Sequence, residues 1–174
     1  GMSESEVRAA LVAGKPQDVF IIQPRAAWVL TDTLVIPDGV TVQGYNPCRG
    51  DYTFKKGFDG DLAQIGSHVA LQGVYFHGNK QGGFKGNGIV DLPGEGEIRG
   101  QHFQFVEVKM FAGNGFVLTR PHRQCKYLWC SFDRNDGYGI YYAPGVDEHS
   151  NNCWESCHFD ANGEGGLALY SPER

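Results

Sequence analysis

Two aspartates, Asp133 and Asp160, stand 27 residues apart in matching sequence contexts, each directly after a phenylalanine and two positions before an asparagine. If the two segments form neighbouring parallel strands in register, their carboxyl groups lie about 5 Å apart. Two carboxylates that close repel each other and raise the pKa of one of them. The separation is also near the ~5–5.5 Å found in retaining glycosidases. The pair is therefore a candidate for acid–base chemistry on a glycosidic bond.

A structural interpretation of the same two aspartates stays open. Lys109 or Arg134 can neutralise them as solvated surface acids, and exposed ion pairs of this kind are common and weak. The aspartates would then form a surface ladder that takes part in no reaction.

Strand alternation gathers other polar and aromatic side chains around the aspartates. If Cys130 and Phe132 point inward, alternation predicts that Tyr127, Trp129 and Asp133 point outward. The same rule places Trp154 and His158 outward in the following segment, and Phe103, Phe105, Glu107 and Lys109 outward in the preceding one. Sugars stack on aromatic rings, so this outer face is the predicted binding surface, although the same rings also suit packing under a loop or a subunit. The predicted catalytic residues are Asp133, Asp160, Glu107 and His158, and the predicted substrate-binding residues are Tyr127, Trp129, Trp154, Phe105, Lys109 and Arg134.

These spacings belong to an internal repeat of 24 to 29 residues that covers most of the chain. Each repeat reads as a short alternating strand, a turn with Asn or Gly, and a second strand. The intervals are too short for a helix in every repeat, and leucine-rich spacing is absent. The sequence therefore predicts an all-β fold, a right-handed parallel β-helix of about five coils. The alignments are 127–142 with 154–169, 87–90 with 114–117, 40–44 with 69–73, and Phe116 with Ile140.

The first residues follow a different pattern. Residues 5–12 have helical periodicity, Ser3 and Glu6 are spaced as in a capping box, and Gly14 and Pro16 end the segment. A helix here would cover the open end of the first coil. We therefore expect a capping helix and lead-in over 1–26 and a single β-helix domain over 27–174.

Composition excludes several classes of protein. The net charge is −5 and no basic stripe is present, which argues against nucleic acid as a partner. No apolar run approaches the ~20 residues of a membrane-spanning helix, so no membrane partner is expected. Glycine is abundant at 25 residues, as regular tight turns require. Five cysteines, an odd number, argue against a fully paired disulfide framework.

A metal site is considered at the repeated histidines His122 and His149. Asp147 and Glu148 stand beside His149, and imidazole with carboxylate suits zinc. The set is incomplete, so no metal ligands and no cofactor are predicted from these residues. The Asn residues of the turns, such as Asn135 and Asn162, are expected to be structural and to bond the next coil.

The opening coil resembles that of the pectate-lyase-like β-helix superfamily, which includes phage tailspikes. The likeness rests on Ile36-Pro37-Asp38-Gly39-Val40-Thr41 after a short helix and a strand, and on the 151–162 segment with Cys157, Phe159 and Asn162. It implies a β-helix, a polysaccharide ligand, and an extracellular, cell-surface or virion location. The motifs of the polygalacturonases are missing. The calcium site of the lyases cannot be mapped onto this chain, so no calcium ligands are assigned and calcium is kept as an alternative to the absence of a cofactor.

Two functions follow as hypotheses. The first is a polysaccharide-interacting domain, acting as a lyase or glycoside hydrolase on acidic or surface glycans. The second is a non-catalytic module of a phage tail or surface fibre. Because the chain stops directly after a strand, we expect either a longer parent chain or an end covered by a partner subunit, such as that of a trimer.

Overall fold

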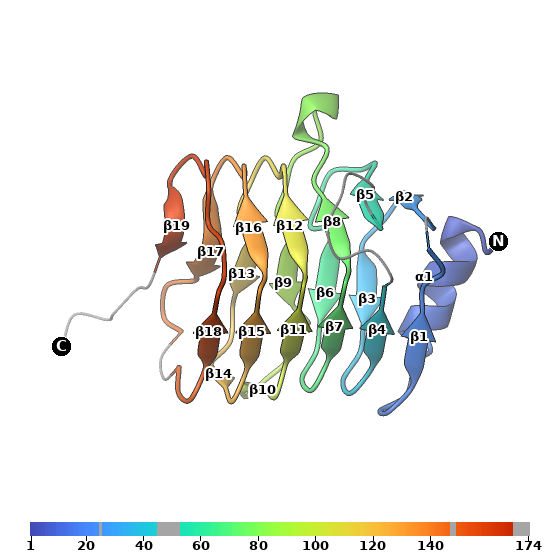
Figure 1. The fold of residues 1–174 in the computed structure, drawn as a ribbon, viewed down its shortest axis with the longest axis horizontal. Helices are drawn as coiled ribbons and strands as arrows, with labels where there is room; N and C mark the ends of the chain where they lie inside the picture. The colour runs from blue at the N-terminus through green and yellow to red at the C-terminus, as the bar shows by residue number, and fades with distance from the viewer. Residues whose placement is uncertain (25, 45–52, 147–148, 169–174) are drawn as a thin grey trace.

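The computed structural model describes residues 1–24, 26–44, 53–146 and 149–168. It is a right-handed parallel β-helix with one helix at its N-terminal end (Figure 1). The elements are α1 (Glu4–Val12), β1 (Val19–Ile21), β2 (Trp28–Leu30), β3 (Leu34–Ile36), β4 (Thr41–Gln43), β5 (Phe54–Lys56), β6 (Ala63–Ile65), β7 (Ala70–Gln72), β8 (Tyr75–His77), the 3₁₀ turn η1 (Lys80–Gly82), β9 (Ile89–Asp91), β10 (Ile98–Arg99), β11 (His102–Gln104), β12 (Glu107–Lys109), β13 (Phe116–Leu118), β14 (His122–Arg123), β15 (Lys126–Leu128), β16 (Ser131–Asp133), β17 (Tyr138–Tyr142), β18 (Cys153–Glu155) and β19 (Gly165–Ala168).

Three parallel sheets form the walls of the β-helix. Sheet A has the strand order β1-β4-β7-β11-β15-β18, sheet B has β16-β12-β8-β5-β2, and sheet C has β19-β17-β13-β9-β6-β3. A short fourth pair, β10 and β14, lies between sheets C and A in the chain. One coil takes a strand from sheet B, then sheet C, then sheet A, and about five coils are completed before β19 (Figure 1). The predicted fold class is confirmed.

The strand register confirms the repeat. Tyr127 pairs with Trp154, Ile140 pairs with both Phe116 and Leu167, and Val42 pairs with Leu71. Residues that align in the sequence are therefore direct lateral neighbours, one strand spacing of about 4.8 Å apart.

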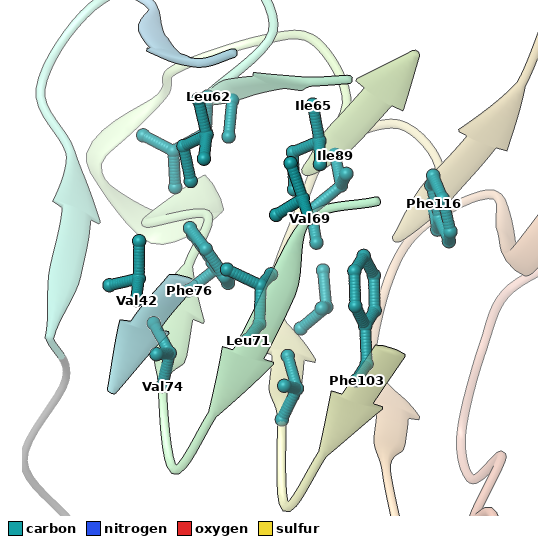
Figure 2. Close-up of a cluster of buried hydrophobic side chains, with 14 of the residues drawn as sticks. Val42, Leu62, Ile65, Val69, Leu71, Val74, Phe76, Ile89, Phe103 and Phe116 are labelled. Atoms are coloured by element: carbon teal, nitrogen blue, oxygen red, sulfur yellow. The ribbon is translucent and has the colours of Figure 1, made fainter. Parts of the chain in front are cut away.

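The core is a column of apolar side chains inside the three sheets. Figure 2 shows Val42, Leu71, Phe76, Phe103 and Phe116 in this interior, and each of them is fully buried. Each such side chain contributes roughly 1.5–3 kcal/mol through its removal from water. Aromatic rings continue the stacking from coil to coil, as for Phe132 and Phe159, whose ring centroids are 5.7 Å apart. The expected inward ladder is confirmed.

The bends between sheets use left-handed backbone in successive coils. Between sheets A and B the bend residue is Gly73, then Phe105, Trp129 and Ser156, with φ values of 60°, 53°, 51° and 51°. Left-handed backbone costs a residue with a side chain about 1–2 kcal/mol. A bend of this kind also interrupts the alternation of side chains, because the strands before and after it belong to different sheets.

Asparagine side chains bond one coil to the next at the turns. Asn162 Oδ1 accepts bonds from the N–H and the side-chain amide of Asn135, both at 3.1 Å. Asn87 Oδ1 accepts from the N–H of Asn114 at 2.8 Å. The structural role expected for these residues is confirmed, and it satisfies backbone groups that the turns would otherwise leave without partners.

Helix α1 packs against β2 and β3 at the N-terminal end of the stack (Figure 1). Ser3 and Glu6 form the predicted capping box, and Val7 and Leu11 bury their side chains against the first coil. The helix thus covers the core there, as expected. Strand β1, within the lead-in, pairs with β4.

Candidate functional site

The outer side of sheet B carries a cluster of polar side chains, here named the polar face. Its strands alternate so that the middle residue points into the core and its neighbours point outward. The register aligns Tyr75 with Glu107 and Ser131, and His77 with Lys109 and Asp133. Ser131 is paired with His158 of the next coil through an isolated parallel β-bridge. The polar face consists of Tyr75, His77, Glu107, Lys109, Ser131, Asp133, His158 and Asp160.

Asp133 is the centre of this face. Its Oδ1 accepts the backbone N–H of Asp160 at 2.9 Å and lies 3.2 Å from His158 Nδ1. Its Oδ2 accepts a hydrogen bond from the Ser131 hydroxyl and lies 3.4 Å from Lys109 Nζ. The Asp133 residue is 5% exposed, so nearly all its hydrogen-bonding capacity is used within the protein.

These contacts set the charge of Asp133. Burial raises its pKa, but the hydrogen bonds from Ser131, the Asp160 N–H and His158, with the Lys109 charge, outweigh burial and lower it. The close carboxylates were expected to raise the pKa of one member of the pair, and for Asp133 the pKa is lowered instead. The contact between the two aspartates runs through the Asp160 N–H, which stabilises the carboxylate form of Asp133.

Lys109 joins two acids of the polar face. Its Nζ lies 3.0 Å from Glu107 Oε2 and 3.4 Å from Asp133 Oδ2. The ammonium group therefore neutralises part of the negative charge, as the structural interpretation of the aspartates required. Beside it, burial first and the Glu107 charge second raise the pKa of Tyr75 to about 12, with the Arg134 charge acting in the opposite direction. The Tyr75 side chain is thus a neutral phenol at physiological pH.

Two aromatic side chains lie at the edge of the polar face. Phe105 and Trp129 occupy the bend between sheets A and B, with their ring centroids 5.0 Å apart and their planes at 13°. They are 39% and 45% exposed. Each precedes a polar-face strand by two residues, so the exposed pair flanks Glu107 and Ser131. The predicted outward position of Phe105 and Trp129 is confirmed.

Tyr127, Trp154 and Phe103 do not point outward, and that expectation is wrong. Tyr127 and Phe103 are fully buried, and the Tyr127 ring stacks on Trp154 with centroids 3.8 Å apart. Trp154 is half-buried and packs against the core. The cause is the left-handed bend at Trp129, which restarts the alternation, so that Tyr127 before the bend and Cys130 after it both point inward. The expected row of aromatics is divided between the interior and the surface.

A buried polar network in the interior was missed by sequence reasoning. His122 Nε2 lies 2.8 Å from Asp91 Oδ1, and His122 Nδ1 lies 3.1 Å from the Tyr127 hydroxyl. That hydroxyl donates to Gln101 Oε1 at 3.2 Å, and Gln101 Nε2 donates to the Gly66 carbonyl at 3.0 Å. No regular spacing in the sequence connects these residues, because they come into contact only when the coils stack. The one signal was the repeat of His122 at His149.

The pKa values of His122 and His149 are shifted in opposite directions. Burial is the largest single effect and lowers the pKa of His122, but the hydrogen bonds and charges of Asp91 and Cys125 together outweigh it and raise the pKa to about 9. Burial and the charge of His122 lower the pKa of His149 to about 4. Asp147 and Glu148, considered with them as metal ligands, lie outside the described residues. Within the part of the chain that the structure describes, no three His, Cys, Asp or Glu side chains are grouped to hold a metal ion.

Comparison with known proteins found no significant match, whether with protein-family models, curated proteins or solved structures. Of the resemblance to the pectate-lyase-like superfamily, the structure supports the parallel β-helix fold alone. None of the helices in the described ranges is long and apolar enough to cross a bilayer.

Proposed function

We propose that the chain is a glycan-binding β-helix module whose ligand lies along the polar face of sheet B. The observation that carries the proposal is the exposed Phe105–Trp129 stack beside that face. A pyranose ring offers C–H groups that pack on such rings, while its hydroxyl groups bond carboxylates and imidazoles. Glu107 and His158 are placed for those bonds.

The backbone at this stack supports a role in binding. Phe105 and Trp129 both have left-handed φ values, and bulky residues are rare in that conformation. The same bend position is Gly73 in the preceding coil and Ser156 in the following one. Smaller residues therefore serve the bend itself, so the turn does not require a large ring at Phe105 or Trp129.

Binding is favoured over acid catalysis by the state of Asp133. A general acid must hold a proton near neutral pH, whereas the contacts of Asp133 lower its pKa. Its oxygens already accept several bonds within the protein, which leaves little room for a substrate.

A second function, proton abstraction from a sugar, has one supporting observation. The His158 side chain is 67% exposed, and its Nδ1 is held by Asp133. A carboxylate that orients an imidazole is a common arrangement for a general base. This would make the chain a lyase acting on acidic glycans, in keeping with the family resemblance.

A glycan array, with and without calcium, followed by calorimetry on the best ligand, tests the binding function. Trp129→Ala should weaken binding at least about tenfold, as expected for loss of a central aromatic contact. Tyr138 and Tyr141, stacked on sheet C with centroids 5.7 Å apart, provide the matched control, and Tyr138→Ala should leave the affinity unchanged. Loss of binding in Tyr138→Ala alone would place the ligand on another face and overturn the proposal.

The same ligand distinguishes binding from catalysis. Incubation with the protein and measurement of new reducing ends or unsaturated sugars should show no turnover. Turnover that His158→Gln abolishes would instead establish the lyase. Light scattering after size exclusion measures the oligomeric state, and a monomer would count against the fibre-like alternative.

A further inference from the structure

Two cysteines occupy equivalent positions in successive coils. Leu128 pairs with Glu155 and Ser131 bridges to His158, so Cys130 and Cys157 lie side by side between these pairs. The His158 N–H donates to the Cys130 carbonyl at 2.8 Å, which fixes this alignment. Lateral neighbours in parallel strands are about 4.8 Å apart, within the ~4.4–6.8 Å between Cα atoms that a disulfide spans.

The two thiols also face the same way. Cys130 is 1% exposed, and Cys157 is half-buried against the same core. Cys130 Sγ lies 3.4 Å from the Leu128 carbonyl oxygen, and Cys157 Sγ lies 3.2 Å from the Tyr127 carbonyl oxygen. The two thiols interact closely enough for each to shift the pKa of the other. Neither side chain has to cross the sheet to meet the other.

We propose that Cys130 and Cys157 form a reversible disulfide that closes the fifth coil into a covalent ring. Both are reduced in the structure, and the oxidant is a low-molecular-weight disulfide such as glutathione disulfide. The Cys157 thiolate attacks one sulfur of that reagent, whose S–S bond breaks and releases one thiol. Cys130 then gives up its proton and displaces the second thiol. The protein loses two electrons and two protons, and the reagent gains both.

The order of attack follows from the surroundings of each sulfur. The hydrogen bond from Cys130 lowers the pKa of Cys157 to about 7, against the effect of burial. The same bond, with burial, raises the pKa of Cys130. Cys157 is thus the thiolate near neutral pH and the more accessible sulfur, which suits it to the first attack.

Cys125 and Cys153 cannot replace this pair. The residue that pairs with Cys153 is Lys126, which points away from the interior, whereas Cys125 is fully buried. Their side chains therefore lie on opposite sides of sheet A, and each serves as a control.

The bond should stabilise the end of the β-helix by restricting the unfolded chain. Closing a loop of this length raises the unfolding temperature by about 5–10 °C in a protein of this size. The effect should be greatest for β16, β17 and β18, which lie within the ring.

The test treats the full chain with glutathione disulfide at pH 8 and maps its peptides by mass spectrometry. We expect a cross-linked peptide pair containing Cys130 and Cys157, with the higher unfolding temperature in the oxidised sample. Cys157→Ser should lose both effects, and Cys153→Ser should keep both. Cys130→Val is a conservative partner variant, since Val106 occupies this position in the preceding coil.

Two results would overturn the proposal. One is a stable mixed disulfide on Cys157 of the wild type with Cys130 still reduced. The other is a cross-link that joins either residue to a different cysteine. Because Cys130→Val and Cys157→Ser change opposite members of the pair, a folding defect in one leaves the other to decide.

Discussion

His122 and Asp91 form an ion pair that no water reaches, with Nε2 and Oδ1 2.8 Å apart and both side chains fully buried inside the β-helix. The pair lies between sheets C and A, with Asp91 at the end of β9 and His122 in β14. It forms only when the third and fourth coils are correctly stacked. Asp91 Oδ2 accepts the N–H groups of Thr119 at 2.7 Å and Arg120 at 3.1 Å. The carboxyl group therefore links the end of β9 to the turn after β13.

Replacing one member of this pair should destabilise the protein strongly. Asp91→Asn leaves the buried imidazole without its counter-charge, and such changes cost about 3–5 kcal/mol. The free energy of unfolding in urea measures the loss. Asp32→Asn, which removes an exposed partner of Arg8, is the control and should cost less than about 1 kcal/mol. Equal losses in the two variants would contradict this account.

The stability of the protein should peak near pH 6.5. His122 has its pKa raised from 6.5 to about 9 on folding, so its contribution is complete below pH 6.5 and is lost as pH rises to 9. That contribution is roughly 3 kcal/mol. His149 has its pKa lowered to about 4, so the unfolded chain binds the proton more tightly and stability falls from pH 6.5 to pH 4.

Urea unfolding at intervals from pH 4 to pH 9 measures this profile. The difference between wild type and His122→Gln isolates the alkaline side, which should be flatter in the variant. A wild-type profile that keeps rising from pH 6.5 to pH 9 would show that the pair does not titrate as described.

Asp133→Asn should weaken both the fold and the polar face. The carboxylate accepts bonds from Ser131 and the Asp160 N–H and lies against His158 and Lys109. Loss of its charge should cost about 1–3 kcal/mol, and glycan affinity should fall several-fold as His158 and Lys109 lose their positions. Because folding lowers the Asp133 pKa, its contribution is present above the unfolded pKa and is lost as pH falls through the folded one.

Asp160→Asn is the matched control for Asp133→Asn. Its side chain is exposed, and its backbone N–H, which bonds Asp133, is unchanged by the substitution. Stability should stay within about 0.5 kcal/mol of wild type. An equal loss of glycan affinity in Asp133→Asn and Asp160→Asn would instead indicate that the two carboxylates act together on the ligand.

Tyr127 and Trp129 should give opposite phenotypes although only Leu128 separates them. Tyr127→Phe removes a buried hydroxyl that bonds His122 and Gln101, so it should cost about 1–3 kcal/mol of stability and leave glycan binding unchanged. Trp129→Ala should weaken binding and cost little stability, because the ring is 45% exposed. Thermal unfolding and calorimetry on both variants check the contrast, and a binding defect in Tyr127→Phe would contradict it.

The sequence by itself determined the coil and its register. Residues such as Phe132 and Phe159 repeat because stacked parallel coils place similar side chains at equivalent positions. The length of the repeat can therefore be read from the sequence without a structure. The capping box of Ser3 and Glu6 and the Asn135–Asn162 ladder were also predictable, since both depend on local spacing or on the repeat.

The tertiary structure decided which way the side chains near each bend point. Alternation predicts orientation only within one strand, and the left-handed residue Trp129 ends one strand and begins another, so Tyr127 turned inward against expectation. The Asp91–His122–Tyr127 network likewise required two stacked coils in contact. Its charges are set by burial and by neighbours brought from distant parts of the chain, and these exist only once the β-helix has formed.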